Sequence, residues 1–133
     1  MVTPKQIVEQ IKDLNLPKGE YIAFGSVPLC LHGIRDCDDI DLFVSPQIYQ
    51  KFKTAGWQET EYTTLRKGPF EAGADWKFGA YNPALKELLA RAKAFDGVPV
   101  ASLKDVVAWK TAFGREKDKV DIELVETYLR NRA

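Results

Sequence analysis

The chain has few of the side chains that build soft-metal or disulfide sites. It contains two cysteines, Cys30 and Cys37, and one histidine in 133 residues. A structural zinc site of cysteines and histidines needs four such ligands, so no such site is expected. The N-terminus lacks the apolar stretch of a secretory signal, and thiols of a protein that is not exported are usually reduced. We therefore interpret both cysteines as structural thiols.

An excess of one charge and long apolar runs are also missing. Lysine plus arginine number 19, and so do aspartate plus glutamate. This balance argues against a protein that binds nucleic acid mainly through an electropositive surface. No run of about 18 apolar residues occurs, so no membrane-spanning segment is expected. Together with the missing secretory signal, these features favour a cytoplasmic location.

What the chain does contain is enough apolar residues, 45% of the total, for the core of a single domain over residues 1–133. Their periodicity, with helix caps and turn residues between them, predicts an α/β (α+β) domain with a small mixed β-sheet and helices packed mainly on its one apolar face. Strands are expected at 21–24, 39–44, 62–66, 70–78 and 98–100. Helices are expected from Pro4 to about Asn15, after Ser26, from Pro46 to about Ala55, from Asn82-Pro83 through Ala92, after Ser102, and at about 118–130, where Ile122, Val125 and Leu129 should face inward.

An acidic pair lies in the second of these strands, which reads Asp-Ile-Asp-Leu-Phe-Val from residue 39 to residue 44. Side chains of a strand alternate between its two faces, so Asp39, Asp41 and Phe43 share one side. Two carboxylates this close repel each other in a partly dry cleft unless a cation lies between them. A hard, oxygen-seeking ion such as magnesium is the natural partner.

A glycine turn follows the first strand and provides the complementary half of a site. Gly25 can take backbone angles that are closed to other residues. A turn that enters a helix at Ser26-Val27-Pro28 presents amide groups and a positive dipole end to an anion such as phosphate. Metal and phosphate are therefore expected to meet in one place.

The combination of Gly25-Ser26, a short helix and Asp39-Ile40-Asp41 resembles the signature of the nucleotidyltransferase superfamily related to DNA polymerase β, and its small prokaryotic members in particular. The resemblance implies a nucleotidyltransferase-like fold in which Gly25 and Ser26 contact the triphosphate of a nucleotide. It also implies two magnesium ions, held by Asp39, Asp41 and a third acid on a later strand.

Two basic residues enter through the same resemblance. Arg35 resembles the arginine that often precedes the acidic pair in the small members of the superfamily. Residues 102–122 are similar to the C-terminal helical segment. Lys110, Arg115 and Lys117 could approach the bound phosphates, and the resemblance favours Lys110; a solvated basic face between two helices is the competing interpretation. A cation there would offset the negative charge that builds up during phosphoryl transfer. The resemblance extends from Tyr21 to Leu129.

The third acid is expected on the strand over residues 70–78. Alternation places Glu71, Gly73, Asp75 and Lys77 on one face. We choose Asp75 because it lies in the middle of the expected strand, whereas Glu71, the alternative, lies close to the turn at residues 67–69. A solvated Asp75 paired with a neighbouring cation is the competing interpretation.

These features predict magnesium-dependent transfer of a nucleoside monophosphate from a nucleoside triphosphate to a hydroxyl acceptor. The alternative is a non-catalytic binding or regulatory module of the same fold, such as a partner in a toxin–antitoxin pair, because a chain of 133 residues leaves little material for an acceptor site. A homodimer or a small protein partner fits the resemblance. The sequence chooses neither the base, nor the acceptor, nor the oligomeric state.

Overall fold

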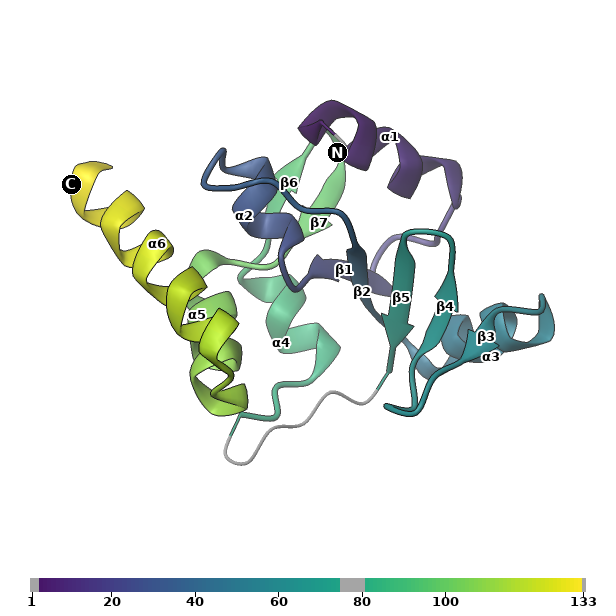
Figure 1. Ribbon diagram of the computed structural model, residues 1–133. Coiled ribbons are helices and arrows are strands. Elements are labelled where there is room, and N and C mark those ends of the chain that lie inside the picture. The colour runs from purple at the N-terminus through teal and green to yellow at the C-terminus, as the bar shows by residue number, and fades with distance from the viewer. Residues whose placement is uncertain (1–2, 75–80, 133) are drawn as a thin grey trace.

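The computed structural model describes residues 3–74 and 81–132, which form a mixed α+β structure of six helices and seven strands (Figure 1). The elements in chain order are α1 (Pro4–Asp13), β1 (Tyr21–Phe24), α2 (Val27–Leu31), β2 (Ile40–Val44), α3 (Pro46–Thr54), β3 (Gln58–Glu59), β4 (Leu65–Lys67), β5 (Phe70–Gly73), α4 (Leu85–Ala90), β6 (Lys93–Phe95), β7 (Val98–Val100), α5 (Leu103–Phe113) and α6 (Glu116–Arg132).

The described strands form one mixed sheet in the order β3-β4-β5-β2-β1-β7-β6. β1 is antiparallel to β2 and parallel to β7, and β2 is parallel to β5. The prediction of a mixed sheet is confirmed. β1 and β2 lie in its middle, so the acidic strand and the strand that leads into the glycine turn are central strands of the sheet.

Three predicted helix starts are confirmed, and each depends on a local cap. The Thr3 side chain and the Gln6 side chain form a reciprocal capping box at α1. The Ser45 hydroxyl accepts a hydrogen bond from the Ile48 amide in α3, and the Ser102 hydroxyl accepts one from the Asp105 amide in α5. Such caps satisfy amide groups that have no partner within the first turn of the helix.

The predicted cap at Asn82-Pro83 is wrong. The helix α4 begins two residues later, and the amide of Ala84 donates to the Glu87 side chain at 2.9 Å. The predicted helix over this region also ended too late. Asp96 and Gly97, with φ of 51° and 82°, instead form the two-residue turn of the β6–β7 hairpin. An Asp-Gly pair between short apolar runs is a strong hairpin signal.

Helices cover both faces of the sheet, so the prediction of packing mainly on one face is wrong. One hydrophobic cluster contains Ile22, Phe24 and Phe43 with residues of α4, α5 and α6. A second contains Ala23 and Leu42 with residues of α1, α2 and α3. The physical reason is that all four residues of β1 are buried, so apolar side chains point to both sides.

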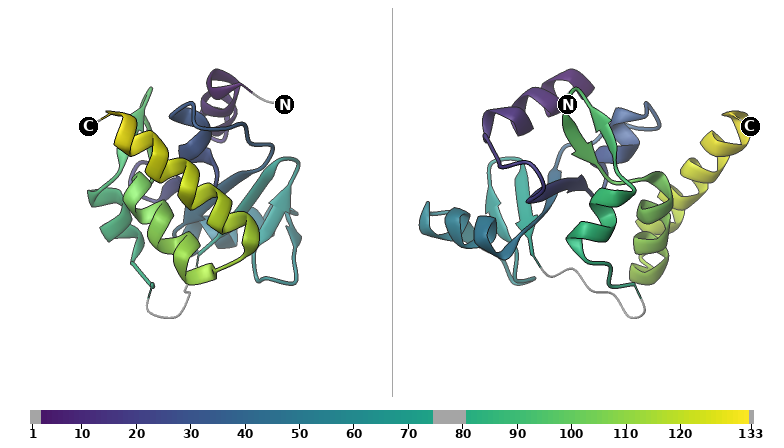
Figure 2. Two further views of the ribbon diagram at one scale, coloured as in Figure 1. Left: turned by 60° about the vertical axis from the view of Figure 1, so that its left-hand side comes forward. Right: turned by 180° about the vertical axis from the view of Figure 1, so that it is seen from behind.

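The two C-terminal helices lie side by side, and α6 projects beyond the body of the structure at its C-terminal end (Figure 2). Val125 is fully buried, as predicted, but Leu129 is 48% exposed. The prediction that Leu129 faces inward is wrong because the helix continues past the elements that it packs against. No described helix is long and apolar enough to cross a membrane.

Candidate functional site

Three carboxylates lie on one face of the sheet, two of them on neighbouring strands and the third directly before β2. Asp41 of β2 is paired with Phe24 of β1 and with Glu71 of β5. Residues paired directly across strands have their side chains on the same face, so Asp41 and Glu71 are neighbours. Asp39 lies two residues before Asp41 and shares its face by alternation. We call Asp39, Asp41 and Glu71 the acidic cluster.

Asp41 carries the strongest electrostatic strain in this cluster. Burial raises the pKa of its carboxyl to about 7, and the charges of Glu71 and Asp39 add to this effect against the opposing charges of Lys110 and Arg66. No described group donates a hydrogen bond to the Asp41 carboxylate. A partly buried carboxylate beside two others, with no donor among the described residues, is a group that a bound cation would stabilise.

The glycine turn lies directly against Asp41. Gly25 has a φ of +62°, and a Cβ atom placed on it would lie 2.8 Å from Asp41 Cγ and would overlap the carboxylate oxygen. Any other residue would force the turn and the acid apart. Glycine is therefore required here both for its backbone conformation and for the close approach.

Ser26 and Arg35 meet at the start of α2. The Ser26 hydroxyl accepts a hydrogen bond from Arg35 Nη2 at 2.6 Å. The same guanidinium donates two hydrogen bonds, of 2.7 and 3.0 Å, to the carboxylate of Asp121 in α6. Arg35 thus connects the glycine turn to the last helix of the chain.

Lys110 is part of the same group of charges. Its ammonium is 3% exposed and lies 2.9 Å from Asp121 Oδ2 and 3.5 Å from Asp118 Oδ1. Arg115 also donates to Asp118, at 2.7 and 2.9 Å. Burial by itself would raise the pKa of Asp118 and of Asp121, but the hydrogen bonds and charges of these cations outweigh it and hold both pKa values below their ordinary range. We call Arg35, Lys110, Arg115, Asp118 and Asp121 the buried ion network.

Asp121→Asn is expected to destabilise the protein by about 2–4 kcal/mol, because it leaves Arg35 and Lys110 short of a negative partner in a buried position. Urea unfolding at neutral pH measures this. Asp96→Asn is the matched control, since Asp96 pairs with Lys12 at 3.0 Å but is 76% exposed, and its loss should change stability by about 0.5 kcal/mol or less. Equal effects of the two substitutions would show that the network adds nothing to stability.

Arg66 of β4 binds the outer two members of the acidic cluster. Its Nη2 lies 3.0 Å from Asp39 Oδ1 and its Nη1 lies 2.8 Å from Glu71 Oε1. The second oxygen of Glu71 accepts a hydrogen bond from the Thr64 hydroxyl at 3.0 Å. Arg66 therefore bridges two carboxylates that come from different strands.

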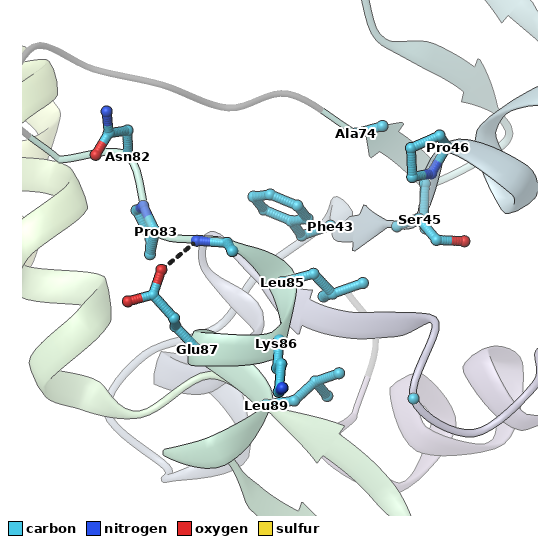
Figure 3. A pocket seen from close by; sticks show the side chains of 13 residues that line it. Phe43, Ser45, Pro46, Ala74, Asn82, Pro83, Leu85, Lys86, Glu87 and Leu89 are labelled. Atoms are coloured by element: carbon cyan, nitrogen blue, oxygen red, sulfur yellow. Dashed lines mark hydrogen bonds between the residues drawn. The ribbon is translucent and has the colours of Figure 1, made fainter.

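A cavity of about 930 Å³ adjoins the same face beyond Phe43, between the end of β2, the end of β5 and the start of α4. Figure 3 shows Phe43, Ala74, Pro83 and Leu85 around it, with the Glu87 carboxylate capping the helix. Phe43 lines the cavity and follows Asp41 by two residues on one strand face, but none of the three acids of the cluster lines it.

The structure brings six of the seven predicted site residues into one region. They lie on β1 and its turn, on the segment from Arg35 into β2, and on α5; these residues are Gly25, Ser26, Arg35, Asp39, Asp41 and Lys110. The seventh, Asp75, lies outside the described residues, so its placement stays a prediction. Glu71, the alternative third acid, is directly in register with Asp41.

Sequence reasoning missed the partners that surround these residues. Asp118 and Asp121 were assigned no site role. They are three residues apart, a spacing that puts both side chains on one helix face and could have served as a signal. Arg66 had a weaker signal. It pairs with Glu71 across the hairpin whose turn is Gly68-Pro69. Once the turn is known to have two residues, its length fixes this pairing.

The donor set fits a hard divalent cation. Asp39, Asp41 and Glu71 offer carboxylate oxygens alone, which are the ligands that magnesium prefers. Within residues 3–74 and 81–132, no group of three or more histidine, cysteine or acidic side chains is arranged in this structure so that it could hold a metal ion. Two of the three carboxylates are instead paired with Arg66.

The site thus combines a glycine turn, a carboxylate with no hydrogen-bond donor among the described residues, two further acids, and a partly buried group of ion-paired cations behind the turn. Such an arrangement can bind a cation and a polyanion side by side. Comparison with known proteins found no relative: no protein-family model, no curated protein and no solved structure matches the chain.

Proposed function

We propose that the protein is a magnesium-dependent nucleotidyltransferase that moves a nucleoside monophosphate from a nucleoside triphosphate to a hydroxyl acceptor. The observation that carries this proposal is the contact between Gly25 and Asp41, where a turn that can hold phosphate lies against a carboxylate with a pKa of about 7. A metal ligand and a phosphate-binding turn must be in contact if one metal ion is to join them.

Each side chain then has a defined task. Asp39 and Asp41 bind the two ions, with Glu71 as the third acid among the described residues and Asp75 as the sequence-based alternative. The amide groups of Gly25 and Ser26 hold the triphosphate. Bound magnesium would lower the barrier to deprotonating the acceptor hydroxyl and would stabilise the leaving pyrophosphate.

The cations of the buried ion network act at longer range in this proposal. Arg35 orients the Ser26 hydroxyl through its 2.6 Å hydrogen bond. Lys110 contributes positive charge close enough to affect the Asp41 carboxylate. Because both are held by Asp121, their positions are set before the nucleotide binds, and such preorganised charge stabilises the transition state most effectively.

The acceptor and the nucleoside need space near the acids, and the candidate for it is the cavity beyond Phe43, although none of the three acids lines it. Its volume of about 930 Å³ lies within the range of small-molecule sites. A cytoplasmic location, where magnesium and nucleoside triphosphates are abundant, fits this proposal.

Calorimetric titration of the protein with each nucleoside triphosphate, in the presence of excess magnesium, tests the proposal. Transfer of label from α-labelled ATP, CTP, GTP and UTP to an acceptor is then measured. Asp41→Asn is expected to abolish metal-dependent binding and to lower transfer at least about a hundredfold. Asp38→Asn, an exposed neighbour outside the acidic cluster, is the matched control and should retain both. Absence of binding heat for the native protein, or unchanged binding by Asp41→Asn, would overturn the proposal. Glu71→Gln and Asp75→Asn decide which acid is the third.

A second candidate is a non-catalytic module that binds another protein, and one observation favours it. Val120 and Leu124, one turn apart on α6, are 59% and 37% exposed. Exposed aliphatic residues one turn apart can form a surface for a partner helix. The label-transfer screen separates the two candidates: label on any acceptor supports the enzyme, whereas tight binding of a protein partner without label transfer supports the module.

A further inference from the structure

Arg66 occupies a position between the carboxylates that the proposed function assigns to the metal. Its two nitrogens lie 3.0 Å from Asp39 and 2.8 Å from Glu71. It supplies one positive charge to a cluster that holds three acids. The guanidinium therefore performs, in the protein without metal, part of the charge neutralisation that a divalent ion would perform.

The surroundings of Arg66 allow it to leave. Its side chain is 43% exposed, and the Asp39 side chain is 59% exposed. Exposed ion pairs are weak, because water solvates both partners well once they separate. A divalent ion carries twice the charge and binds carboxylate oxygens directly, so it competes successfully for the same acids.

Glu71 keeps a second contact when Arg66 moves away. Its Oε2 accepts a hydrogen bond from Thr64, and Thr64 is itself buried at 1% exposure. This contact orients the carboxylate toward the cluster without neutralising its charge. Loss of Arg66 therefore leaves an acid that is held in place and unpaired.

We propose that Arg66 is a built-in counter-ion that holds Asp39 and Glu71 in the metal-free protein and is displaced when a divalent cation binds. This inference rests on the proposed function, because it takes the acidic cluster as the metal site. It adds a residue that sets the affinity of this site for a divalent cation.

The test is titration with Mn²⁺ in the absence of nucleotide, with the free ion measured by electron paramagnetic resonance. Arg66→Gln is expected to bind Mn²⁺ about five- to tenfold more tightly than the native protein, because two ion pairs are lost, an exposed one with Asp39 and a partly buried one with Glu71. Arg66→Lys should have an intermediate Mn²⁺ affinity, because a single ammonium group cannot bridge both carboxylates as the two guanidinium nitrogens do. It also provides a reading if Arg66→Gln fails to fold.

Arg91→Gln is the matched control. Arg91 is 46% exposed and binds the Asp105 carboxylate through two hydrogen bonds of 2.9 Å, but it lies outside the acidic cluster, so its loss should leave Mn²⁺ affinity unchanged. Equal affinities of native and Arg66→Gln protein, both abolished by Asp41→Asn, would overturn the counter-ion role and leave the metal site standing. Absence of Mn²⁺ binding in every variant, or binding unaffected by Asp41→Asn, would overturn the proposed function, and the counter-ion role with it.

Discussion

Gly25→Ala is expected to lower the free energy of unfolding by about 2–4 kcal/mol and to abolish nucleotide binding. Two penalties combine in this variant. The backbone φ of +62° is unfavourable for alanine, and the new methyl group would lie 2.8 Å from Asp41 Cγ, closer than any real contact. The turn or the acid must move, and either movement separates the phosphate-binding amides from the metal ligand. Equilibrium urea unfolding and nucleotide titration measure the two effects.

Gly33→Ala separates the two penalties. Gly33 has a similar φ of +74°, but nothing lies within 4 Å of the position of its missing Cβ. Its substitution should therefore cost only the backbone term, about 1 kcal/mol. In an Asp41→Gly background, which removes the overlapping side chain, the cost of Gly25→Ala should fall to a similar value. If Gly25→Ala proves no more costly than Gly33→Ala in the native background, the contact between the turn and Asp41 is wrong.

Asp41→Asn is expected to stabilise the protein while removing its metal-dependent binding. In the folded protein the pKa of Asp41 is raised to about 7, whereas in the unfolded chain it is about 4. The folded state therefore binds more protons than the unfolded state between these two values, and stability falls as the pH rises through this window. Asparagine does not ionise, so it avoids the loss. The gain should be on the order of 2–4 kcal/mol at pH 8.

The pH dependence of this gain distinguishes the electrostatic cause from better packing. At pH 5 the gain should be less than half its value at pH 8, and near pH 3 it should almost vanish, because the carboxyl is then mostly protonated in both states. Urea unfolding of the native and variant proteins at the three pH values measures the difference. Asp38→Asn should show no such trend. A loss of stability for Asp41→Asn at pH 8 would mean that favourable contacts hold the carboxylate, which would argue against a cation site.

The predictions for Gly25→Ala and Asp41→Asn concern the same contact, that of the glycine turn with the Asp41 carboxylate. A carboxylate that lowers stability when it is ionised is retained at functional sites, where a ligand supplies the missing partner. Magnesium should accordingly raise the melting temperature of the native protein, and raise it more at pH 8 than at pH 6, because the ion binds the deprotonated carboxylate. The same ion should leave the melting temperature of Asp41→Asn almost unchanged.

Local features of this protein could be predicted well. The caps at Thr3, Ser45 and Ser102 were identified because a cap involves residues only three positions apart. The hairpin at Asp96-Gly97 was missed even though its signal is equally local, because the apolar residues before it also suit a helix. The prediction that helices cover mainly one face of the sheet was wrong for another reason. The four consecutive buried residues of β1 do not by themselves show which elements cover them.

The sequence by itself determined the elements of the candidate site. Strand alternation puts Asp39 and Asp41 on one face, and glycine at position 25 permits the turn that follows β1, because both properties depend on backbone geometry over a few residues. Only the tertiary structure decided what these elements meet. Arg35 and Asp121 are 86 positions apart in the chain, and Arg66 and Asp39 are 27 apart. Such pairs depend on how strands and helices pack against one another, so the close contact of the turn with Asp41, the buried ion network and the counter-ion at the acidic cluster emerge only with the folded chain.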